Sequence, residues 1–296
     1  MSLKRIFEVM KKEGYVVKDL EAYLLSLSST DSDRAIDVNA PSQIGKCLRE
    51  RYYARTGCES EGVLDPRSRR VLDNGTHVHI RLQEYLKNQG ILLLDEVPVV
   101  NDEYNIQGHT DGILSLGAEC AVLEIKSIND KGFNELIDAK PEHKMQGLTY
   151  VYCIEQRRKY LHSTYNDMAE FFADEEDRNK QYASYYTHLK DGSKYTRQEK
   201  VEFQVDLHQH LDYILMGLTI PVTKCIFLYE NKNTQQLKEF CVNSKSPESS
   251  DIIDKVLSEC ATLNDAVLKG KIPDRIAKSP SSPMCRWCNF KSECWN

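Results

Sequence analysis

The 296-residue sequence has no apolar run that approaches the roughly 20 residues needed to cross a bilayer. It also lacks the features of a secretory signal near its first residues, where a short amphipathic stretch stands instead. These absences predict a cytoplasmic protein without a membrane partner. Hydrophobic residues make up 41% and charged residues 28% of the chain, which is ordinary for a globular protein with a substantial core.

A surplus of basic residues is also missing, because 39 Lys and Arg stand against 45 Asp and Glu, for a net charge of −6. Affinity for nucleic-acid phosphates comes largely from Lys and Arg, so the overall charge argues mildly against a nucleic-acid-binding protein. It argues little against a nuclease, since a metal site itself concentrates carboxylates. Basic residues still gather locally, at 46–55, 67–70 and 157–159.

Ten cysteines in a cytoplasmic chain are not expected to form a disulfide framework. Most stand in apolar or mixed surroundings and are interpreted as buried free thiols. Cys285, Cys288 and Cys294 differ, because they follow the spacing C-x2-C-x5-C at the end of the chain. A tail with so little core of its own needs something to order it, and metal ligation by these thiols is the expected answer.

Three thiols are one ligand short of a closed tetrahedral site or an iron–sulfur cluster. Cys47 and Cys58 are both candidates for the fourth ligand, and spacing alone does not choose between them. The number of ligands likewise does not separate zinc from a [4Fe–4S] cluster.

Two acidic residues and a lysine lie on neighbouring strand-like runs at 104–114 and 121–126, joined by a short turn at 116–119. Because side chains alternate along a strand, Glu124 and Lys126 are expected on one side of the sheet. A hairpin would bring Asp111 beside them. Two carboxylates and an ammonium are costly as core filling, but they suit a site for a hard divalent cation with a lysine beside it.

The remaining pattern predicts a mixed α/β chain, with a central mixed sheet flanked by helices. Strands are expected at 91–100, 104–116 and 120–127, and a hairpin at 225–229 and 237–242. A helix capped by Ser42 is expected from Gln43 through Tyr53. Further helices are expected over 69–89, from 142 into the 150s, and over about 250–269.

Several short motifs occur in a fixed order along the chain: Pro41-Ser-Gln-Ile-Gly-Lys-Cys-Leu-Arg49, Gly75-Thr-His-Val-His79, Gly108-His-Thr-Asp111, Glu124-Ile-Lys126, Gln146-Gly-Leu-Thr-Tyr150 and the terminal cysteines. In this order they resemble a RecB-like nuclease of the PD-(D/E)XK superfamily. More narrowly, they resemble the iron–sulfur branch that contains CRISPR-associated protein four and its phage-encoded relatives. The resemblance covers residues 41–296, interrupted by 155–222.

The resemblance implies a restriction-endonuclease-like core and a division of the chain into five parts. They are an N-terminal helical region (1–90), a nuclease core (91–154), a helical insertion (155–222), a core hairpin (223–246), and a C-terminal helix with an iron–sulfur tail folded back onto the N-terminal region (247–296). The insertion is interpreted either as a lid or partner-binding element, or as a solvated excursion without a role.

The resemblance also assigns roles by position. Asp111 and Glu124 are similar to the carboxylates that bind Mg²⁺ or Mn²⁺, and Lys126 is similar to the catalytic lysine. His79 and Ile125 are expected to complete the metal shell, whereas His77 is not assigned a role. Cys47 joins Cys285, Cys288 and Cys294 as the ligands of a [4Fe–4S] cluster.

Gln146 and Tyr150 stand four residues apart, share one helix face and are expected to contact the DNA backbone. Gln209 and Tyr213 repeat that spacing and are the alternative pair. The implied activity is metal-dependent exonucleolytic cleavage of DNA, on single strands or ends. A homo-oligomer or a protein partner of recombination or CRISPR type is also expected.

Two other functions stay open from the sequence. One is a DNA-binding or assembly protein of the same fold that no longer cuts. The other is a zinc or redox-responsive module in which only the cysteines matter.

Overall fold

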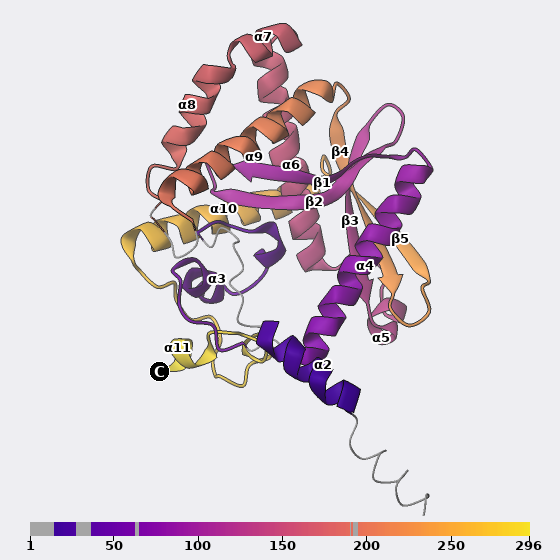
Figure 1. Ribbon diagram of the computed structural model, residues 1–296, viewed down its shortest axis with the longest axis vertical. Coiled ribbons are helices and arrows are strands. Elements are labelled where there is room, and N and C mark those ends of the chain that lie inside the picture. Colours follow the sequence, from indigo (N-terminus) through magenta and orange to yellow (C-terminus); the bar gives the residue numbers. More distant parts are fainter. Residues whose placement is uncertain (1–14, 28–36, 63–64, 190, 192–194) are drawn as a thin grey trace, which may run out of the picture.

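The computed structural model describes residues 15–27, 37–62, 65–189, 191 and 195–296 (Figure 1). The first 14 residues and residues 28–36 of the predicted N-terminal helical region lie outside this part. The described chain is an α/β fold with a five-stranded mixed sheet flanked by helices, which confirms the predicted fold class. No helix in these ranges is both long and apolar enough to cross a membrane.

The sheet has the strand order β1-β2-β3-β4-β5. All pairs are antiparallel except β3 and β4, which run parallel. The strands are β1 (Leu92–Asn101), β2 (Ile106–Ser115), β3 (Cys120–Ile128), β4 (Val222–Asn231) and β5 (Leu237–Asn243). The expected hairpins are therefore present, and the tight turn between β2 and β3 uses Gly117 at φ +84°.

Helices cover both faces of this sheet. Helix α6 (Pro141–Thr164) and helix α9 (Arg197–Gly217) pack on one face, where they share a large apolar core with Val122, Phe227 and Tyr229. Helix α4 (Pro66–Asn88) lies on the other face and buries Val78 and Leu82 against the second apolar cluster. The first four residues of β3, Cys120–Leu123, are buried from both sides and are all apolar, as is common for a strand covered on both faces.

The ends of these helices follow from short-range signals. Helix α4 begins at Pro66 after Asp65, whose carboxylate accepts a hydrogen bond from the Ser68 N–H (2.9 Å). Helix α10 (Pro247–Lys269) ends at Gly270, which adopts φ +62°.

The predicted start of the helix at Gln43 was wrong. Residues Pro41–Gln43 form the short 3₁₀ helix η2, and helix α3 (Leu48–Arg55) begins only after Gly45 has turned the chain at φ +92°. Ser42 therefore caps no helix here, and Cys47 stands at the N-cap of α3. Helix α2 (Tyr15–Ser26) lies beside α4 (Figure 1).

Residues 155–222 contain the second half of α6, the short helices α7 (Met168–Ala173) and α8 (Glu175–Tyr185), and α9. Leu161, Leu211 and Leu215 from this stretch are fully buried in the main apolar core. The two long helices are therefore part of the packed body. Helices α7 and α8 lie at the top of Figure 1, where Phe171 of α7 joins the same core and Tyr182 of α8 is buried. The proposed role of this stretch as a lid or partner site stays a prediction.

A buried charge network ties α6, α8 and α9 together. Asp212 is fully buried and accepts two bonds from the Arg157 guanidinium (2.7 and 2.6 Å). The Tyr182 hydroxyl donates to the same carboxylate. A bidentate arginine is the partner best matched to a buried carboxylate.

The C-terminal segment folds back on α3 and α10. Phe290 packs with Tyr53 (ring centroids 6.0 Å apart) and with Leu263 of α10. The Glu61 N–H donates to the Asn289 carbonyl (2.8 Å). Helix α11 (Lys291–Trp295) closes the chain.

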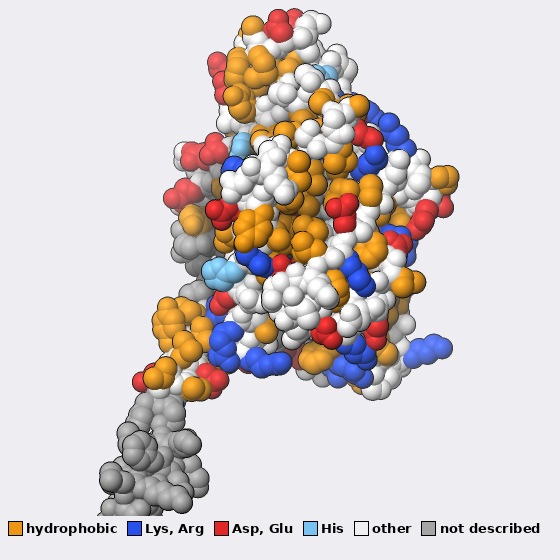
Figure 2. All heavy atoms as spheres, turned by 90° about the vertical axis from the view of Figure 1, so that its right-hand side faces the viewer, with side chains coloured by type: hydrophobic (Ala, Val, Ile, Leu, Met, Phe, Trp, Pro, Cys, Tyr) orange, Lys and Arg blue, Asp and Glu red, His pale blue; other side chains and the backbone are white. Residues whose placement is uncertain are grey.

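Figure 2 shows one face of the molecular surface, on which charged side chains also occur among the apolar ones. On the face seen in Figure 2, hydrophobic side chains gather in the upper half of the molecule, and Lys and Arg side chains gather along its lower edge.

Removing the buried carboxylate should destabilise the fold. We expect Asp212→Ala to lower the free energy of unfolding by about 3 kcal/mol, because it leaves the Arg157 charge without its partner. Urea unfolding at pH 7 measures this. Asp206→Ala, on an exposed position of the same helix, is the matched control and should change the value by less than about 0.5 kcal/mol. Equal stabilities of the two variants would contradict a structural role for the network.

Candidate active site

The site forms where β2 separates from β3. The ladder between these strands ends at the pair Gly112–Leu123. Beyond it, side chains of β2 bond to the backbone of β3: the Asp111 carboxylate accepts from the Ile125 N–H (Oδ2–N 2.5 Å), and the Thr110 hydroxyl donates to the Leu123 carbonyl (3.1 Å). Side chains thus satisfy backbone groups that a continued ladder would have paired.

Gly112 is required at this point by the neighbouring strand. A Cβ atom there would lie 2.5 Å from the Leu94 carbonyl oxygen of β1. The Gly-His-Thr-Asp-Gly sequence therefore combines a close backbone approach with two side chains that reach across to β3.

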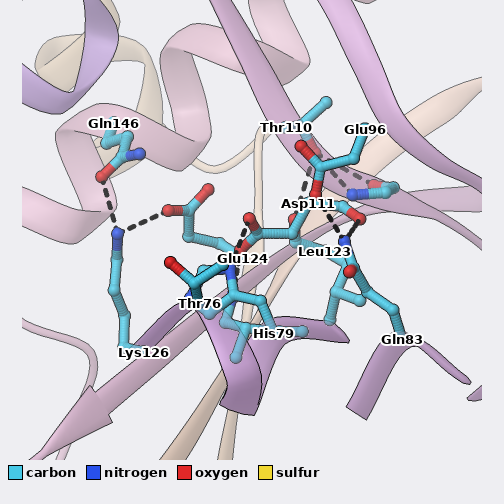
Figure 3. Close-up of polar contacts among 12 residues, drawn as sticks. Thr76, His79, Gln83, Glu96, Thr110, Asp111, Leu123, Glu124, Lys126 and Gln146 are labelled. Carbon is cyan, nitrogen blue, oxygen red and sulfur yellow. Dashed lines mark hydrogen bonds and ion pairs between the residues drawn. The ribbon is translucent and has the colours of Figure 1, made fainter. Parts of the chain in front are cut away.

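Glu124 and Lys126 lie on the same side of β3, as their alternation predicted. Lys126 Nζ is 2.5 Å from Glu124 Oε1 and also donates to Gln146 Oε1 of α6 (3.0 Å) (Figure 3). The Gln146 amide in turn donates to the Tyr150 hydroxyl (3.3 Å). The structure therefore brings Gln146 and Tyr150 into one hydrogen-bonded chain with the lysine.

Both members of that pair are buried, with 8% of Gln146 and 3% of Tyr150 exposed. The alternative pair lies on α9, where Gln209 bonds to Glu175 of α8 and Tyr213 packs beside Phe172 of α7. Neither Gln209 nor Tyr213 has a described contact with Asp111, Glu124 or Lys126. The predicted contact of either pair with DNA stays a prediction.

His79 reaches the site from the opposite side of the sheet. Its Nδ1 lies 3.0 Å from Asp111 Oδ1. Burial by itself would lower the pKa of His79, but the hydrogen bond to Asp111 and the negative charges of Asp111 and Glu124 outweigh burial and raise it. The Asp111 carboxylate is therefore held at both oxygens, by α4 and by β3.

Glu124 is the least favourably placed charge in this group. Burial raises its pKa to about 7, and the nearby Asp111 carboxylate adds to the shift, while Lys126 and His79 oppose it. Its Oε2 atom is buried and has no hydrogen-bond partner in the described part of the chain. Leaving such an acceptor unpaired costs about 1–3 kcal/mol, more for a charged group.

A hard divalent cation fits this donor set. The ligands would be Asp111 and Glu124, with His79 and the Ile125 carbonyl completing the shell, and the unpaired Glu124 oxygen supports this assignment. Within the described residues, no three His, Cys, Asp or Glu side chains are already spaced to hold one ion. Asp111 Oδ1 contacts His79 and Glu124 Oε1 contacts Lys126, which leaves Glu124 Oε2 without a partner among the described residues.

Three further residues border the site and were not found from the sequence. Gln83 and Glu96 lie on the far side of Asp111 (Figure 3). His143 of α6 lies 2.7 Å from the Tyr229 hydroxyl and stacks on its ring, and burial and the charge of Lys126 lower its pKa to about 3. The available signal was helical spacing, because Gln83 follows His79 by four residues and His143 precedes Gln146 by three.

The four predicted cluster cysteines line one cavity between α3 and the C-terminal segment. Cys47 joins Cys285, Cys288 and Cys294 there, whereas Cys58 is not among the lining residues. In this structure the four thiols are not spaced as ligands of one ion.

The surroundings of this cavity suit an anionic group. Arg49, Arg275 and Lys291 line it together with one acid, Glu50, which is paired with Lys46 (3.2 Å). The Nε atom of Arg49 and the Nε1 atom of Trp295 are buried donors without an acceptor in the described residues. A metal centre with four thiolate ligands carries net negative charge and accepts such hydrogen bonds. The donor set therefore fits either zinc or an iron–sulfur cluster.

No protein-family model and no curated protein matches the chain. Among solved structures, the chain is similar to the protein described as "Crystal structure of SSO0001", with a TM-score of 0.44 and 15% sequence identity over 95% of this chain and 97% of that one. At this identity and TM-score, the similarity assigns no activity to either site.

The raised pKa of Glu124 predicts a pH-dependent stability. Between its ordinary value of 4.5 and about 7, the folded chain keeps a proton on Glu124 that the unfolded chain has released, so this group's contribution to stability is lost as pH rises through that window. We expect Glu124→Gln to gain stability relative to the parent from pH 5 to pH 8 in EDTA, by urea unfolding. Glu135→Gln, at an exposed position, should keep a constant difference from the parent. If the stability difference between Glu124→Gln and the parent did not change with pH, the raised pKa of Glu124 would be contradicted.

The cavity also predicts which cysteine would complete a metal site with the other three. We expect anaerobically purified protein to contain iron and acid-labile sulfide, and Cys47→Ser to lose both together with thermal stability. Cys58→Ser is the matched control and should keep both. Retention of the metal by Cys47→Ser with its loss in Cys58→Ser would overturn the assignment, and zinc in place of iron would contradict the cluster.

Proposed function

We propose that the chain is a Mg²⁺- or Mn²⁺-dependent DNA exonuclease that acts on single strands or DNA ends. The observation that carries this proposal is Glu124, a buried carboxylate with one unpaired oxygen, placed between Asp111 and Lys126. In the same proposal, Cys47, Cys285, Cys288 and Cys294 hold a structural [4Fe–4S] cluster.

Hydrolysis of a phosphodiester needs a positioned water and neutralisation of the charge that grows on the phosphate. A divalent cation bound by Asp111 and Glu124 would supply that neutralisation and a more acidic bound water. The chain itself supplies Lys126, whose ammonium can donate to a phosphate oxygen or orient the water.

The neighbours of Lys126 support such a role. Glu124 and Gln146 both bond to its Nζ, so the ammonium has a defined direction without being fully buried; 21% of its side chain remains exposed. Gln146 and, through it, Tyr150 position the lysine. His79 holds Asp111 from the other side.

DNA as the substrate, and a homo-oligomer or a recombination or CRISPR-type protein as a partner, belong to this proposal. Phosphate chemistry with a lysine and a hard cation supports a nucleic-acid substrate. The negative net charge favours contact at a local site over binding along a uniformly basic surface.

Digestion of end-labelled single-stranded DNA in Mn²⁺ tests the active site. We expect Asp111→Ala and Lys126→Ala to lower the rate by about a hundredfold or more, because each removes a group that stabilises the reacting phosphate or its cation. DNA binding, measured by fluorescence anisotropy, should change little.

Matched controls are Asp206→Ala and Lys131→Ala, both at exposed positions away from the site. Equal digestion by all variants would refute the proposed site. No digestion by the parent, with DNA binding retained, would favour the non-cutting DNA-binding protein. Loss of both cutting and binding would leave the cysteine module as the remaining function.

A further inference from the structure

The side-chain amide of Gln83 links α4 to β1 and β2 next to Asp111. Its Nε2 atom donates to the Asp111 backbone carbonyl (2.8 Å) and to Glu96 Oε1 (2.7 Å). Both acceptors are oxygens, so only the NH₂ end of the amide satisfies them, which fixes its orientation. Gln83 is 7% exposed, and these bonds connect α4, β1 and β2.

Gln83 lies one helical turn after His79. Helix α4 therefore contacts Asp111 twice, through His79 at the carboxylate and through Gln83 at the backbone carbonyl (Figure 3). The backbone contact matters because the direction of a short side chain follows the dihedral angles of its own residue.

Glu96 shows strain at the same place. It adopts φ +47°, a left-handed conformation inside a strand, although the register on either side is regular, with Asp95 paired to Gly112 and Val97 to Thr110. A non-glycine residue in this region is strained and persists only where the surrounding structure holds it. Between those two pairs of the ladder, Glu96 and Asp111 form no pair, and the Gln83 amide bonds to the Glu96 carboxylate and to the Asp111 carbonyl.

We propose that Gln83 is a positioning residue that sets the direction of the Asp111 carboxylate for cation binding, and that its bond to Glu96 holds the strained segment of β1 away from that carboxylate. This inference rests on the proposed cation site and deepens it. Gln83 touches neither the cation nor DNA in this proposal, and it acts through the Asp111 backbone.

The test is Mn²⁺ affinity without DNA, measured from the EPR signal of free Mn²⁺ at a temperature where each variant is folded by circular dichroism. Gln83→Met keeps the length of the side chain and removes both donors. We expect its Mn²⁺ dissociation constant to rise about tenfold, as is typical when a group that supports a metal ligand is lost. Gln89→Leu, at the exposed end of the same helix, should match the parent.

A double exchange separates the two bonds of Gln83. Gln83→Glu with Glu96→Gln restores a hydrogen bond between these residues, with donor and acceptor reversed, and keeps the net charge. It leaves the Asp111 carbonyl without a donor, so we expect the affinity to stay low. This variant also keeps the test open if Gln83→Met does not fold.

Parent-like Mn²⁺ affinity in folded Gln83→Met, or full recovery in the double exchange, would overturn the positioning role. Absence of Mn²⁺ binding by the parent would overturn it as well. A parent that binds Mn²⁺ but leaves DNA intact would refute the nuclease and leave the role of Gln83 standing.

Discussion

The bond from the Ile125 N–H to the Asp111 carboxylate is the interaction on which the candidate site depends. It forms because the β2–β3 ladder ends at the pair Gly112–Leu123. Beyond that pair, backbone groups of β3 bond to side chains of β2 and not to its backbone. A ladder that continued for two more residues would pair those groups with backbone and leave Asp111 without this contact. The departure of one strand from its neighbour therefore creates the acidic centre.

The rest of the fold compensates for the charges gathered there. Glu124 is buried with an unpaired oxygen, and two apolar clusters, one on each face of the sheet, enclose the strand that carries it. Local destabilisation of this kind is tolerated at functional sites when the surrounding packing is sufficient. Lys126 and His79, which come from different elements, reduce the electrostatic cost without removing it.

The cysteine cavity also combines apolar packing with polar groups that lack partners. Phe290 against Tyr53 and Leu263 provides a small apolar anchor, and the four thiols lie beside it among cationic and unpaired donor groups. Neither feature alone would order this segment. The anchor sets where the tail lies, and the donors would suit an anionic group held by the thiols.

Much of this could be predicted from the sequence, because the relevant signals are local. Alternation along β3 predicted that Glu124 and Lys126 share a side, the turn at Gly117 predicted the hairpin with Asp111, and helical spacing predicted α4, α6 and α10. Gly45 shows the limit of such patterns, because its left-handed φ moved the start of α3 away from Ser42. The resemblance had already named Cys47 and His79, whereas tertiary structure alone showed that Cys58 does not line the cavity and that Gln83 and Glu96 join His79 around Asp111. The physical reason is distance along the chain: periodicity reports which face of its own element a residue occupies, whereas packing of α4 against β1 and β2 decides what that face meets.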